Sequence, residues 1–287
     1  MTPANFATLA AMLHAGSGLV VGPDKQYLLE TRLAAILRQH GLRDLDALAE
    51  RLREPPAGRA LEFQVIEAQV IEAQVIEAMT TNESFFFRDD KPFAHVRTTA
   101  LPWLHAARPA GARLRIWSAA ASSGQEAYSL AMLLAEARAM LAGRSVEILG
   151  TDLSREQLER ARAGLYTQFE VQRGLPMQYL VKYFTKEGAN WRIAAAIRAM
   201  TGFREWNLLA DPRPLGVFDL VFCRNVLIYF DQPTKTRVLD AIARQMAPDG
   251  LLYLGGAETV IGLGSRFAAV PGERGIYALV RASEMAK

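Results

Sequence analysis

Apolar residues in the first 78 positions recur at the spacing of a helix. The clearest run has intervals of three and four residues, which predicts one buried helix face: Leu28, Leu29, Leu33, Ile36 and Leu37. Gly41 ends that helix, a shorter helix follows at 45–52, and Pro55 and Pro56 then break the pattern. We therefore expect a small helical domain over residues 1–78.

A five-residue unit, Gln-Val-Ile-Glu-Ala, occurs three times in tandem from Gln64 to Ala78. Five residues turn a helix by about 140° beyond one full turn, so the Val-Ile pairs are expected to spread around the axis without forming an apolar stripe. The period also fails to match the two-residue period of a strand. We interpret the repeat as a duplication that lengthens a linking helix.

From about residue 113 the pattern changes to short apolar strands that alternate with helices. Strands are expected at 113–120, 146–152, 203–206, 217–223 and 250–255. After a turn at 122–124, a helix is expected to run to about residue 141. Further helices are expected at 154–163 and from Pro233 to near Met246, and a closing hairpin is expected at 267–270 and 275–280. This alternation is typical of an α/β fold with a mostly parallel, doubly wound sheet, here over residues 79–287.

The composition agrees with a folded protein and excludes several classes. The chain has 287 residues, of which 51% are hydrophobic and 22% charged, so a large core is available and disorder is excluded. A net charge of +3 gives no indication of nucleic-acid binding. Cys223 is the only cysteine, so no intrachain disulfide forms, and the sequence shows neither a membrane span nor a signal peptide. A cytoplasmic protein that does not insert into the membrane is expected.

Two acidic residues stand where a parallel sheet binds ligands, beyond the carboxyl ends of its strands. Asp152 ends the second strand, where it can accept hydrogen bonds from ribose hydroxyls; a turn or helix-capping aspartate is the alternative. Glu126 opens the helix after the first strand, where a dinucleotide-binding protein would have a glycine fingerprint. A carboxylate there repels phosphate and suits the cationic end of S-adenosylmethionine, which disfavours a nicotinamide enzyme.

The segment 80–88 is rich in polar side chains and has three consecutive phenylalanines before Arg88. Asn82, Ser84 and Arg88 suggest a segment that covers a ligand, with the aromatic rings seating it. Packing of the rings in the core alone explains the pattern equally well, so the residues by themselves leave both interpretations open.

Several of these segments together resemble the successive motifs of the CheR family of chemotaxis receptor methyltransferases. They stand in that family's order and at similar spacings: 81–88, 122–129, 151–152, 207–209 and 218–231. The run Cys-Arg-Asn-Val-Leu-Ile-Tyr-Phe at 223–230 is the most specific of them. Lys25, Tyr27 and Arg32 are similar to the family's N-terminal helical domain, so the resemblance covers nearly the whole chain.

The resemblance implies a small N-terminal helical domain followed by a Rossmann-like class I methyltransferase domain. That domain would have an antiparallel last strand and a small antiparallel β-subdomain at about 166–203. The implied cofactor is S-adenosylmethionine, with S-adenosylhomocysteine as the product and no metal. The cofactor contacts carried over by position are Asn82, Ser84, Arg88, Glu126, Asp152, Asn207, Leu208, Arg224 and Asn225. Among them Glu126 would hold the methionyl amino group, Asp152 the ribose, and Asn207 and Leu208 the adenine.

The implied reaction is methylation of receptor glutamates, with Arg88 and Tyr229 near the methyl group as catalytic residues. A glutamate is ionised at neutral pH and needs no general base, so the enzyme would align the two reactants, an effect worth roughly 7–11 kcal/mol. The alternatives are a half-buried aromatic for Tyr229 and a structural salt bridge for Arg224. Cys223 ends an apolar strand and is expected to be a small core residue.

Recognition of the receptor is assigned to a basic stretch of the N-terminal domain. Between residues 31 and 43 the chain has Arg32, Arg38 and Arg43, and no acid. We expect these arginines to meet the acidic cytoplasmic helices of methyl-accepting receptors; an ordinary solvated helix face is the alternative. The protein is expected to be a monomer, and the sequence itself carries no evidence on assembly.

Three departures from the family stand out. Gly256 and Ala257 replace two polar residues that relatives often have before a glutamate. The stretch 183–192 is a short turn where some relatives have a longer loop that docks a receptor's C-terminal peptide, so we expect no such tether. The repeat adds about two units before Thr80, which would lengthen the linking helix by about 15 Å or loop out.

Two rival classes complete the comparison. A nucleic-acid amino-methyltransferase is disfavoured because no Asn/Asp-Pro-Pro-aromatic motif follows the fourth strand. A non-catalytic cofactor-binding protein stays open, since Asp152 and Glu126 could persist in a chain whose altered linker prevents activity.

Overall fold

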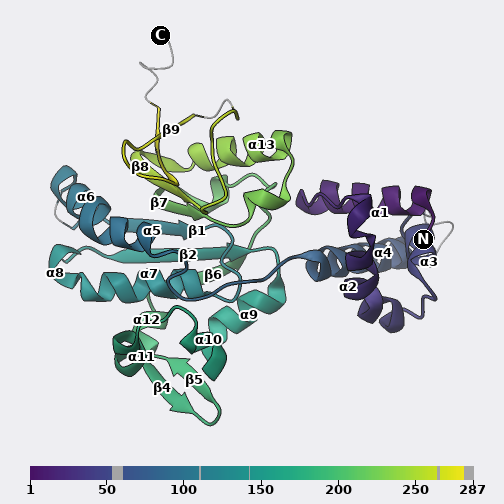
Figure 1. The fold of residues 1–287 in the computed structure, drawn as a ribbon, viewed down its shortest axis with the longest axis horizontal. Helices are drawn as coiled ribbons and strands as arrows, with labels where there is room; N and C mark the ends of the chain where they lie inside the picture. Colours follow the sequence, from purple (N-terminus) through teal and green to yellow (C-terminus); the bar gives the residue numbers. More distant parts are fainter. Residues whose placement is uncertain (54–60, 110, 142, 264–265, 281–287) are drawn as a thin grey trace. The chain divides into compact units, whose positions relative to one another are not determined.

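The computed structural model describes residues 1–53, 61–109, 111–141, 143–263 and 266–280. The chain forms two compact units, Met1–Thr81 with Tyr229–Thr234 and Asn82–Ile228 with Lys235–Lys287 (Figure 1). A short segment from the C-terminal part of the sequence therefore belongs with the N-terminal helices. Within the described ranges, no helix is both long enough and apolar enough to cross a membrane.

The first unit is built from helices, as the apolar periodicity predicted. They are α1 (Pro3–Ser17), the 3-10 turn η1 (Pro23–Lys25), α2 (Gln26–Gln39), α3 (Leu45–Arg53) and α4 (Leu61–Met79). Leu29, Leu33 and Ile36 on α2 are buried in their common core. The helix ends two residues before Gly41, whose φ is 64°. The predicted break at residues 55–56 lies outside the described residues.

The tandem repeat lies in one continuous helix, α4, and contributes a buried stripe. Ile71 and Val75, with Met79 after the repeat, are at most 5% exposed and pack in the core of the first unit. Val70, next to Ile71, is exposed, so the Val-Ile pairs still spread around the axis as predicted, although Ile71 and Val75 share one face. A Val-Ile pair offers two adjacent apolar positions, so the Ile of one unit and the Val of the next lie four residues apart, on one face. The side chains of residues 61–67, which include most of the first copy, are outside the described part.

The segment Tyr229–Thr234 packs with the helices of the first unit. The backbone N–H of Val20, in the turn after α1, donates to the carbonyl of Tyr229 (3.0 Å). Nε2 of His14 lies 3.0 Å from Oδ2 of Asp231, and both side chains are partly exposed. A main-chain bond, the contact between His14 and Asp231 and the buried side chain of Phe230 thus hold this segment.

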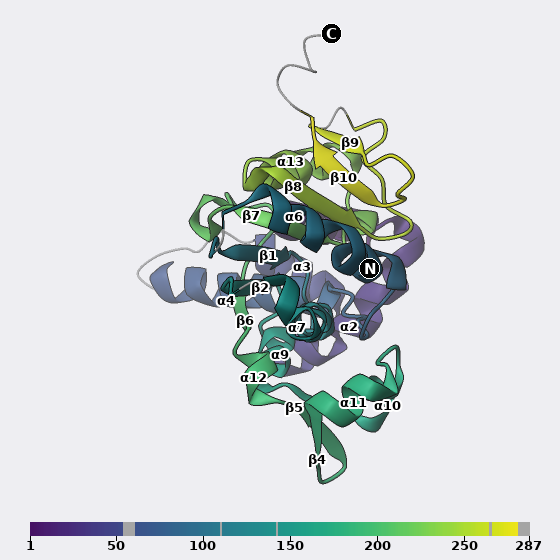
Figure 2. The ribbon, with the colours of Figure 1, turned by 90° about the vertical axis from the view of Figure 1, so that its left-hand side faces the viewer.

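The second unit contains a seven-stranded sheet. Its strands are β1 (Leu114–Ser118), β2 (Val146–Asp152), β6 (Thr201–Glu205), β7 (Phe218–Cys223), β8 (Met246–Leu254), β9 (Phe267–Ala269) and β10 (Ile276–Leu279). Their order is β6-β2-β1-β7-β8-β10-β9 (Figures 1 and 2). The five neighbours β6, β2, β1, β7 and β8 run parallel to one another, and β10 runs antiparallel to β8. The predicted Rossmann-like sheet with an antiparallel last strand is confirmed.

Short helices alternate with these strands. They are α5 (Asp90–His95), α6 (Leu101–Ala107), α7 (Gln125–Glu136), α8 (Arg138–Leu141), α9 (Arg155–Ala163), α10 (Gln168–Gln172), α11 (Met177–Tyr183), α12 (Ala195–Arg198) and α13 (Gln232–Ala243). Three further turns are the π-helical η3 (Val96–Ala100) and the 3-10 turns η4 (Arg213–Leu215) and η5 (Leu227–Tyr229). Helices α7 and α9 pack against β2 and β6.

The boundary between α13 and β8 differs from the prediction. The helix ends at Ala243 rather than near Met246, and the strand begins at Met246 rather than at Gly250. Met246 pairs with Phe218 before a shift of register, which carries the strand through Pro248 and Gly250. Proline and glycine within a strand often mark such a bulge, so composition alone placed the strand start too late.

A second, three-stranded sheet forms the β-subdomain that was expected at about 166–203. It consists of β3 (Leu165–Thr167), β4 (Phe184–Glu187) and β5 (Asn190–Ile193), in the order β3-β5-β4. Figure 1 labels β4 and β5. The stretch 183–192 is a tight hairpin of β4 and β5, with Gly188 at φ 60° in its turn. The predicted short turn is therefore confirmed.

Candidate active site

The predicted cofactor residues lie where the strands of the main sheet end. Along the sheet, Asn207 follows β6, Asp152 ends β2, Glu126 opens the helix after β1, and Arg224 follows β7. Because these strands are parallel neighbours, their carboxyl ends meet along one edge. All nine predicted cofactor contacts belong to this second unit.

Asp152 is held by backbone N–H groups. Its Oδ2 accepts from the N–H of Ser122 (2.7 Å) and its Oδ1 from the N–H of Ser154 (3.0 Å). The cap of α9 is Ser154, whose hydroxyl accepts from the N–H of Gln157 (3.2 Å). Asp152 is therefore not the cap, although it supports the turns after β1 and β2. Its contact with ribose stays a prediction.

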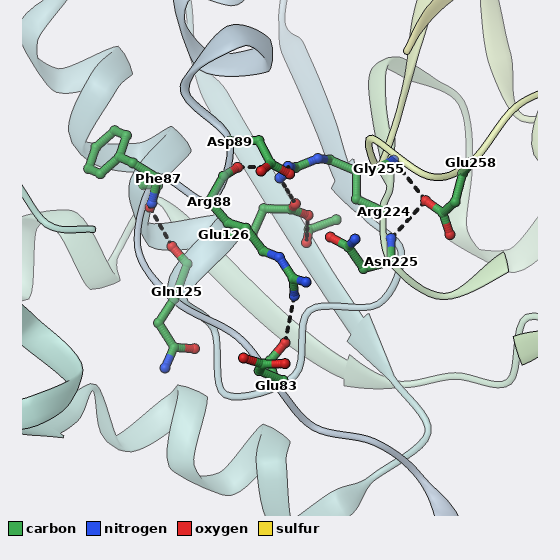
Figure 3. A network of polar contacts seen from close by, with 12 residues as sticks. Glu83, Phe87, Arg88, Asp89, Gln125, Glu126, Arg224, Asn225, Gly255 and Glu258 are labelled. Atoms are coloured by element: carbon green, nitrogen blue, oxygen red, sulfur yellow. Dashed lines mark hydrogen bonds and ion pairs between the residues drawn. The ribbon is translucent and has the colours of Figure 1, made fainter. Parts of the chain in front are cut away.

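An ion-pair network joins the ends of β1 and β7 (Figure 3). Nη1 of Arg224 lies 2.9 Å from Oε2 of Glu126, and Nη2 lies 2.8 Å from Oδ2 of Asp89. Nη2 also donates to the carbonyl of Arg88 (2.6 Å), and Oε1 of Glu126 accepts from the hydroxyl of Ser118 (2.7 Å). The side chain of Arg224 is 2% exposed and that of Glu126 is 12% exposed, so the pair is largely shielded from water.

This network gives Arg224 the structural role that was the alternative to cofactor binding. Removing one partner from a buried pair destabilises a protein by about 3–5 kcal/mol. Nε of Arg224 is buried and has no hydrogen-bond partner among the described residues, which is rare for a buried donor. The same side chain therefore keeps one donor unsatisfied, and its contact with the cofactor stays a prediction.

The polar segment before α5 is tied to this edge of the sheet. The carbonyl of Asn82 accepts from the hydroxyl of Ser122 (3.4 Å), and the N–H of Phe87 donates to Oγ of Ser129 (2.9 Å). Phe87 and Asp89 have φ values of 48° and 58°, which residues other than glycine rarely adopt. Backbone conformations of this kind cluster at functional sites, where the surroundings hold them.

The sequence left open whether the three phenylalanines only pack in the core or also seat a segment that covers a ligand, and the structure shows a different setting for each group. Phe86 and Phe87 are buried in the core. Phe85 lies at its border, and the guanidinium of Arg88 sits over its ring at 5.2 Å. Nη1 of Arg88 also donates to the carbonyl of Glu83 (3.0 Å; Figure 3). Two rings thus anchor the segment, while the third orients the partly exposed Arg88.

Glu258 is a residue of this edge that sequence reasoning missed. It follows β8, the parallel neighbour of β7, and its carboxylate accepts from five backbone N–H groups. Figure 3 shows the bonds with Asn225 and Gly255. Four of the donors are residues 225–228, in the loop after β7. The available signal was an acid just beyond a strand end.

The remaining predicted cofactor residues lie in turns along the same edge. Oδ1 of Asn207 accepts from the N–H of Leu209 (2.9 Å), which closes a turn around Leu208. Ser84 is half-buried in the segment before α5, and Asn225 has φ 58° in the loop after β7. The contacts of these residues with a cofactor stay predictions.

Cys223 ends β7 and is fully buried. Burial raises the pKa of its thiol well above the usual value. The thiol therefore stays protonated and unreactive at neutral pH, so the expected core role is confirmed.

Tyr229, the second predicted catalytic residue, belongs to the first unit. It ends the turn η5 and is partly exposed. Its catalytic role stays a prediction.

The three predicted receptor-binding arginines have different settings in the first unit. Nη1 of Arg32 donates to the carbonyls of Met79 (2.7 Å) and Thr80 (2.9 Å), so Arg32 caps the C-terminus of α4. Arg38 is exposed, and Arg43 pairs at the surface with the adjacent Asp44 (3.1 Å). Arg32 thus has a structural role that the sequence did not reveal, whereas Arg38 and Arg43 face solvent.

The acceptors along the sheet edge fit S-adenosylmethionine. A carboxylate has about four acceptor sites, and Ser118 and Arg224 use two of those on Glu126, which leaves capacity for an ammonium group. Asp152, at the neighbouring strand end, offers acceptors suited to hydroxyl groups. An acid in the first turn of α7 opposes a phosphate there, which agrees with a cationic ligand.

Comparison with known proteins assigns the family. Residues 4–64 match the family model "CheR methyltransferase, all-alpha domain" and residues 82–276 match "CheR methyltransferase, SAM binding domain". The chain is 37% identical over 276 residues to chemotaxis protein methyltransferase Cher2 of Pseudomonas putida, covering 95% of this chain and 96% of that protein. It is 39% identical over 277 residues to chemotaxis protein methyltransferase 1 of Pseudomonas aeruginosa, with 95% and 96% covered. It is 37% identical over 275 residues to chemotaxis protein methyltransferase 1 of Vibrio cholerae, with 94% of each covered. The chain therefore belongs to the CheR family of S-adenosylmethionine-dependent methyltransferases.

Proposed function

We propose that this chain transfers a methyl group from S-adenosylmethionine to glutamate side chains of methyl-accepting chemotaxis receptors. The products are a glutamate methyl ester and S-adenosylhomocysteine. The observation that carries the proposal is the pair of acids, Asp152 and Glu126, at adjacent strand ends in a chain of this family. The reaction serves sensory adaptation in the cytoplasm, with the enzyme acting as a monomer.

The cofactor is held by residues from three strand ends in this proposal. The carboxylate of Glu126 pairs with the methionyl ammonium, Asp152 accepts from the ribose hydroxyls, and Asn207 with Leu208 borders the adenine. When bound, S-adenosylmethionine supplies a methyl group that is activated by the positive charge on its sulfur. Because Arg224 already holds one oxygen of Glu126, the carboxylate orients the ammonium without moving.

Arg88 has the charge and the setting to hold the acceptor carboxylate. The carbonyl of Glu83 and the ring of Phe85 fix its guanidinium and use only part of its five donors. A receptor glutamate is ionised at neutral pH, so no proton has to be removed from it. Arg88 and Tyr229 therefore need only hold the carboxylate in line with the methyl group, and alignment of this kind is worth roughly 7–11 kcal/mol.

Arg38 and Arg43 are the residues that we expect to meet the receptor. Both present their charge to solvent, and the methylated receptor helices are acidic, so the two surfaces are complementary. Arg32 contributes less directly, since its donors cap α4.

The proposal is tested with receptor-bearing membranes and S-adenosylmethionine labelled in its methyl group. Wild-type protein should place base-labile label on the receptor, because esters hydrolyse in base. Asp152→Ala should remove both cofactor binding and labelling, whereas Glu159→Gln, a change at an exposed acid on α9, should retain both. Tight binding of the cofactor by the wild type without transfer to any receptor would contradict the proposal.

A further inference from the structure

The loop that follows β7 is shaped by one carboxylate. Glu258 is 8% exposed, so its hydrogen bonds form largely away from water. Its two oxygens accept from five backbone N–H groups: those of Asn225 (2.8 Å), Val226 (2.9 Å), Leu227 (2.7 Å), Ile228 (3.3 Å) and Gly255 (2.7 Å). One side chain thus satisfies four successive donors of the loop together with the end of β8.

This contact requires an anion. An ionised carboxylate is an acceptor only, and each oxygen of Glu258 takes two or three of the bonds. Hydrogen bonds to an ionised acceptor are roughly twice as strong as bonds between neutral groups. A glutamine would keep one carbonyl oxygen but would turn an NH₂ group towards the backbone donors. Glutamine at position 258 would therefore lose some of the five hydrogen bonds, although its side chain has the same size as that of glutamate.

The loop needs this support because its backbone is unusual. Asn225 has φ 58°, in the left-handed region that residues other than glycine seldom adopt. A Cβ at Gly255 would lie 2.7 Å from Oε2 of Glu258 and 2.8 Å from Nδ2 of Asn225. Both side chains therefore pack directly on the main chain of Gly255, and a Cβ at that position would have to displace them.

The loop lies in the sequence between two residues to which the proposed function gives a role. Arg224, immediately before it, bridges Glu126 and Asp89. Tyr229, immediately after it, is a proposed catalytic residue. The main-chain path between these two residues is the part of the chain that Glu258 holds.

We propose that Glu258 is a positioning residue for methyl transfer, which fixes the main-chain path from Arg224 to Tyr229. The inference rests on the function proposed above. Asp152 and Glu126, which hold the cofactor in that proposal, are fixed by contacts of their own. Loss of the carboxylate at position 258 therefore affects the transfer step more than the affinity for the cofactor.

Glu258→Gln tests this inference, with Glu159→Gln as the matched control. The kcat of receptor methylation should fall about 10- to 100-fold, the loss expected when reacting groups are misplaced by about 1 Å. The Kd of S-adenosylmethionine, measured by calorimetry, should change less than about threefold, since binding and orientation are separable.

Glu258→Asp, which keeps the anion on a shorter side chain, should recover part of kcat. Gly255→Ala should reproduce the defect because its Cβ displaces the carboxylate.

Hydrogen exchange provides a readout that does not depend on catalysis. In Glu258→Gln the amides of residues 225–228 should exchange faster, while those of β1 and β2 keep their protection. Wild-type kcat in Glu258→Gln would overturn the inference. Faster exchange throughout the second unit, with kcat per folded molecule retained, would overturn it as well, because the role would then be structural only. If the wild type forms no receptor ester, the proposed function fails, and exchange at 225–228 still decides whether Glu258 holds the loop.

Discussion

The motif at 223–230 is continuous in sequence but divided in structure. Residues 223–228 belong to the second unit, where Glu258 holds the backbone and Arg224 is paired with two carboxylates. Tyr229 and Phe230 belong to the first unit, where the segment Tyr229–Thr234 is held by a backbone bond, the buried Phe230 side chain and a contact between His14 and Asp231. The first half is held mainly by the shielded side chains of Arg224, Glu126 and Glu258, whereas the charged contact of the second half is exposed.

Because the two halves differ in burial, substitutions in them should differ in their effect on stability. A buried pair that loses one partner leaves an uncompensated charge, so changes in the first half should affect stability and cofactor binding together. An exposed pair contributes about 0–1 kcal/mol, so changes in the second half should leave stability nearly intact. Any large effect there must come from the chemistry of Tyr229 itself.

The largest effect is expected from Arg224→Ala in the first half. Glu126, whose side chain is 12% exposed, would lose its cation, and breaking such a pair typically costs about 3–5 kcal/mol of unfolding free energy. Cofactor affinity should fall as well, because Glu126 is the proposed ligand of the ammonium. Urea unfolding and calorimetry measure the two losses. Arg213→Ala, at an arginine whose side chain is 81% exposed, should change neither. Wild-type stability in Arg224→Ala would show that the network does not support the first half.

Tyr229→Phe should show the opposite pattern in the second half. The hydroxyl is proposed to hydrogen-bond the acceptor carboxylate, and a bond to a charged group is worth about 1.5–3 kcal/mol, or roughly 10- to 100-fold in kcat. Unfolding free energy and the Kd of S-adenosylmethionine should stay at wild-type values. Tyr27→Phe, at a tyrosine that is 60% exposed, is the control. A kcat equal to that of the wild type would remove Tyr229 from the catalytic set.

The strand-end residues were predictable because their signals are local. Strand β2 has the bounds that the apolar run predicted, Val146–Asp152, and the next helix, capped by Ser154, lies within the predicted range 154–163. Asp152 and Glu126 could therefore be placed at adjacent strand ends from the amino-acid sequence alone. Alternation of strands and helices fixes which ends of the strands meet, so the residues that gather at those ends are predictable.

Residues whose role depends on distant partners were not predictable. Glu258 acts on a loop about 30 positions earlier, and Arg32 caps a helix that ends 47 positions later. Asp89 pairs with Arg224 across 135 positions. Neither periodicity nor motif spacing contains these pairings, since they arise only when the sheet brings the segments together. The division of the motif between two units is hidden for the same reason.

Charge reversal at Arg38 and Arg43 tests the receptor-binding part of the first unit. Two acidic residues would repel the acidic receptor helices, so the KM for the receptor should rise about tenfold, and less at high salt. Binding of S-adenosylmethionine should be unchanged. Reversal at Lys186 and Arg266, both exposed in the second unit, gives the same change in net charge and should leave KM unaffected. Loss of cofactor binding in the variant reversed at Arg38 and Arg43 would contradict the proposal that these residues bind only the receptor.

The smallest effect is expected from Asp231→Asn in the second half. Oδ1 of Asp231 accepts from the N–H of Thr234 (2.9 Å) at the start of α13, a bond that asparagine can also accept. Only the partly exposed pair with His14 is lost, which is worth about 0.2–1 kcal/mol. Hydrogen bonds from Thr234 lower the pKa of the Asp231 carboxyl in the folded protein. Its contribution to stability is therefore present above the unfolded pKa of about 3.9 and is lost as the pH falls through the lower folded value.

The difference in unfolding free energy between wild type and Asp231→Asn should accordingly be small at pH 7 and disappear in acid. Thermal or urea unfolding across this range measures it. The kcat should change less than about twofold, because the backbone bond from Val20 to Tyr229 does not involve the carboxylate. A fall in kcat as large as that expected for Glu258→Gln would mean that the ion pair, rather than the main-chain bond, holds Tyr229. The two halves of the motif would then depend on charge to the same degree, despite their different burial.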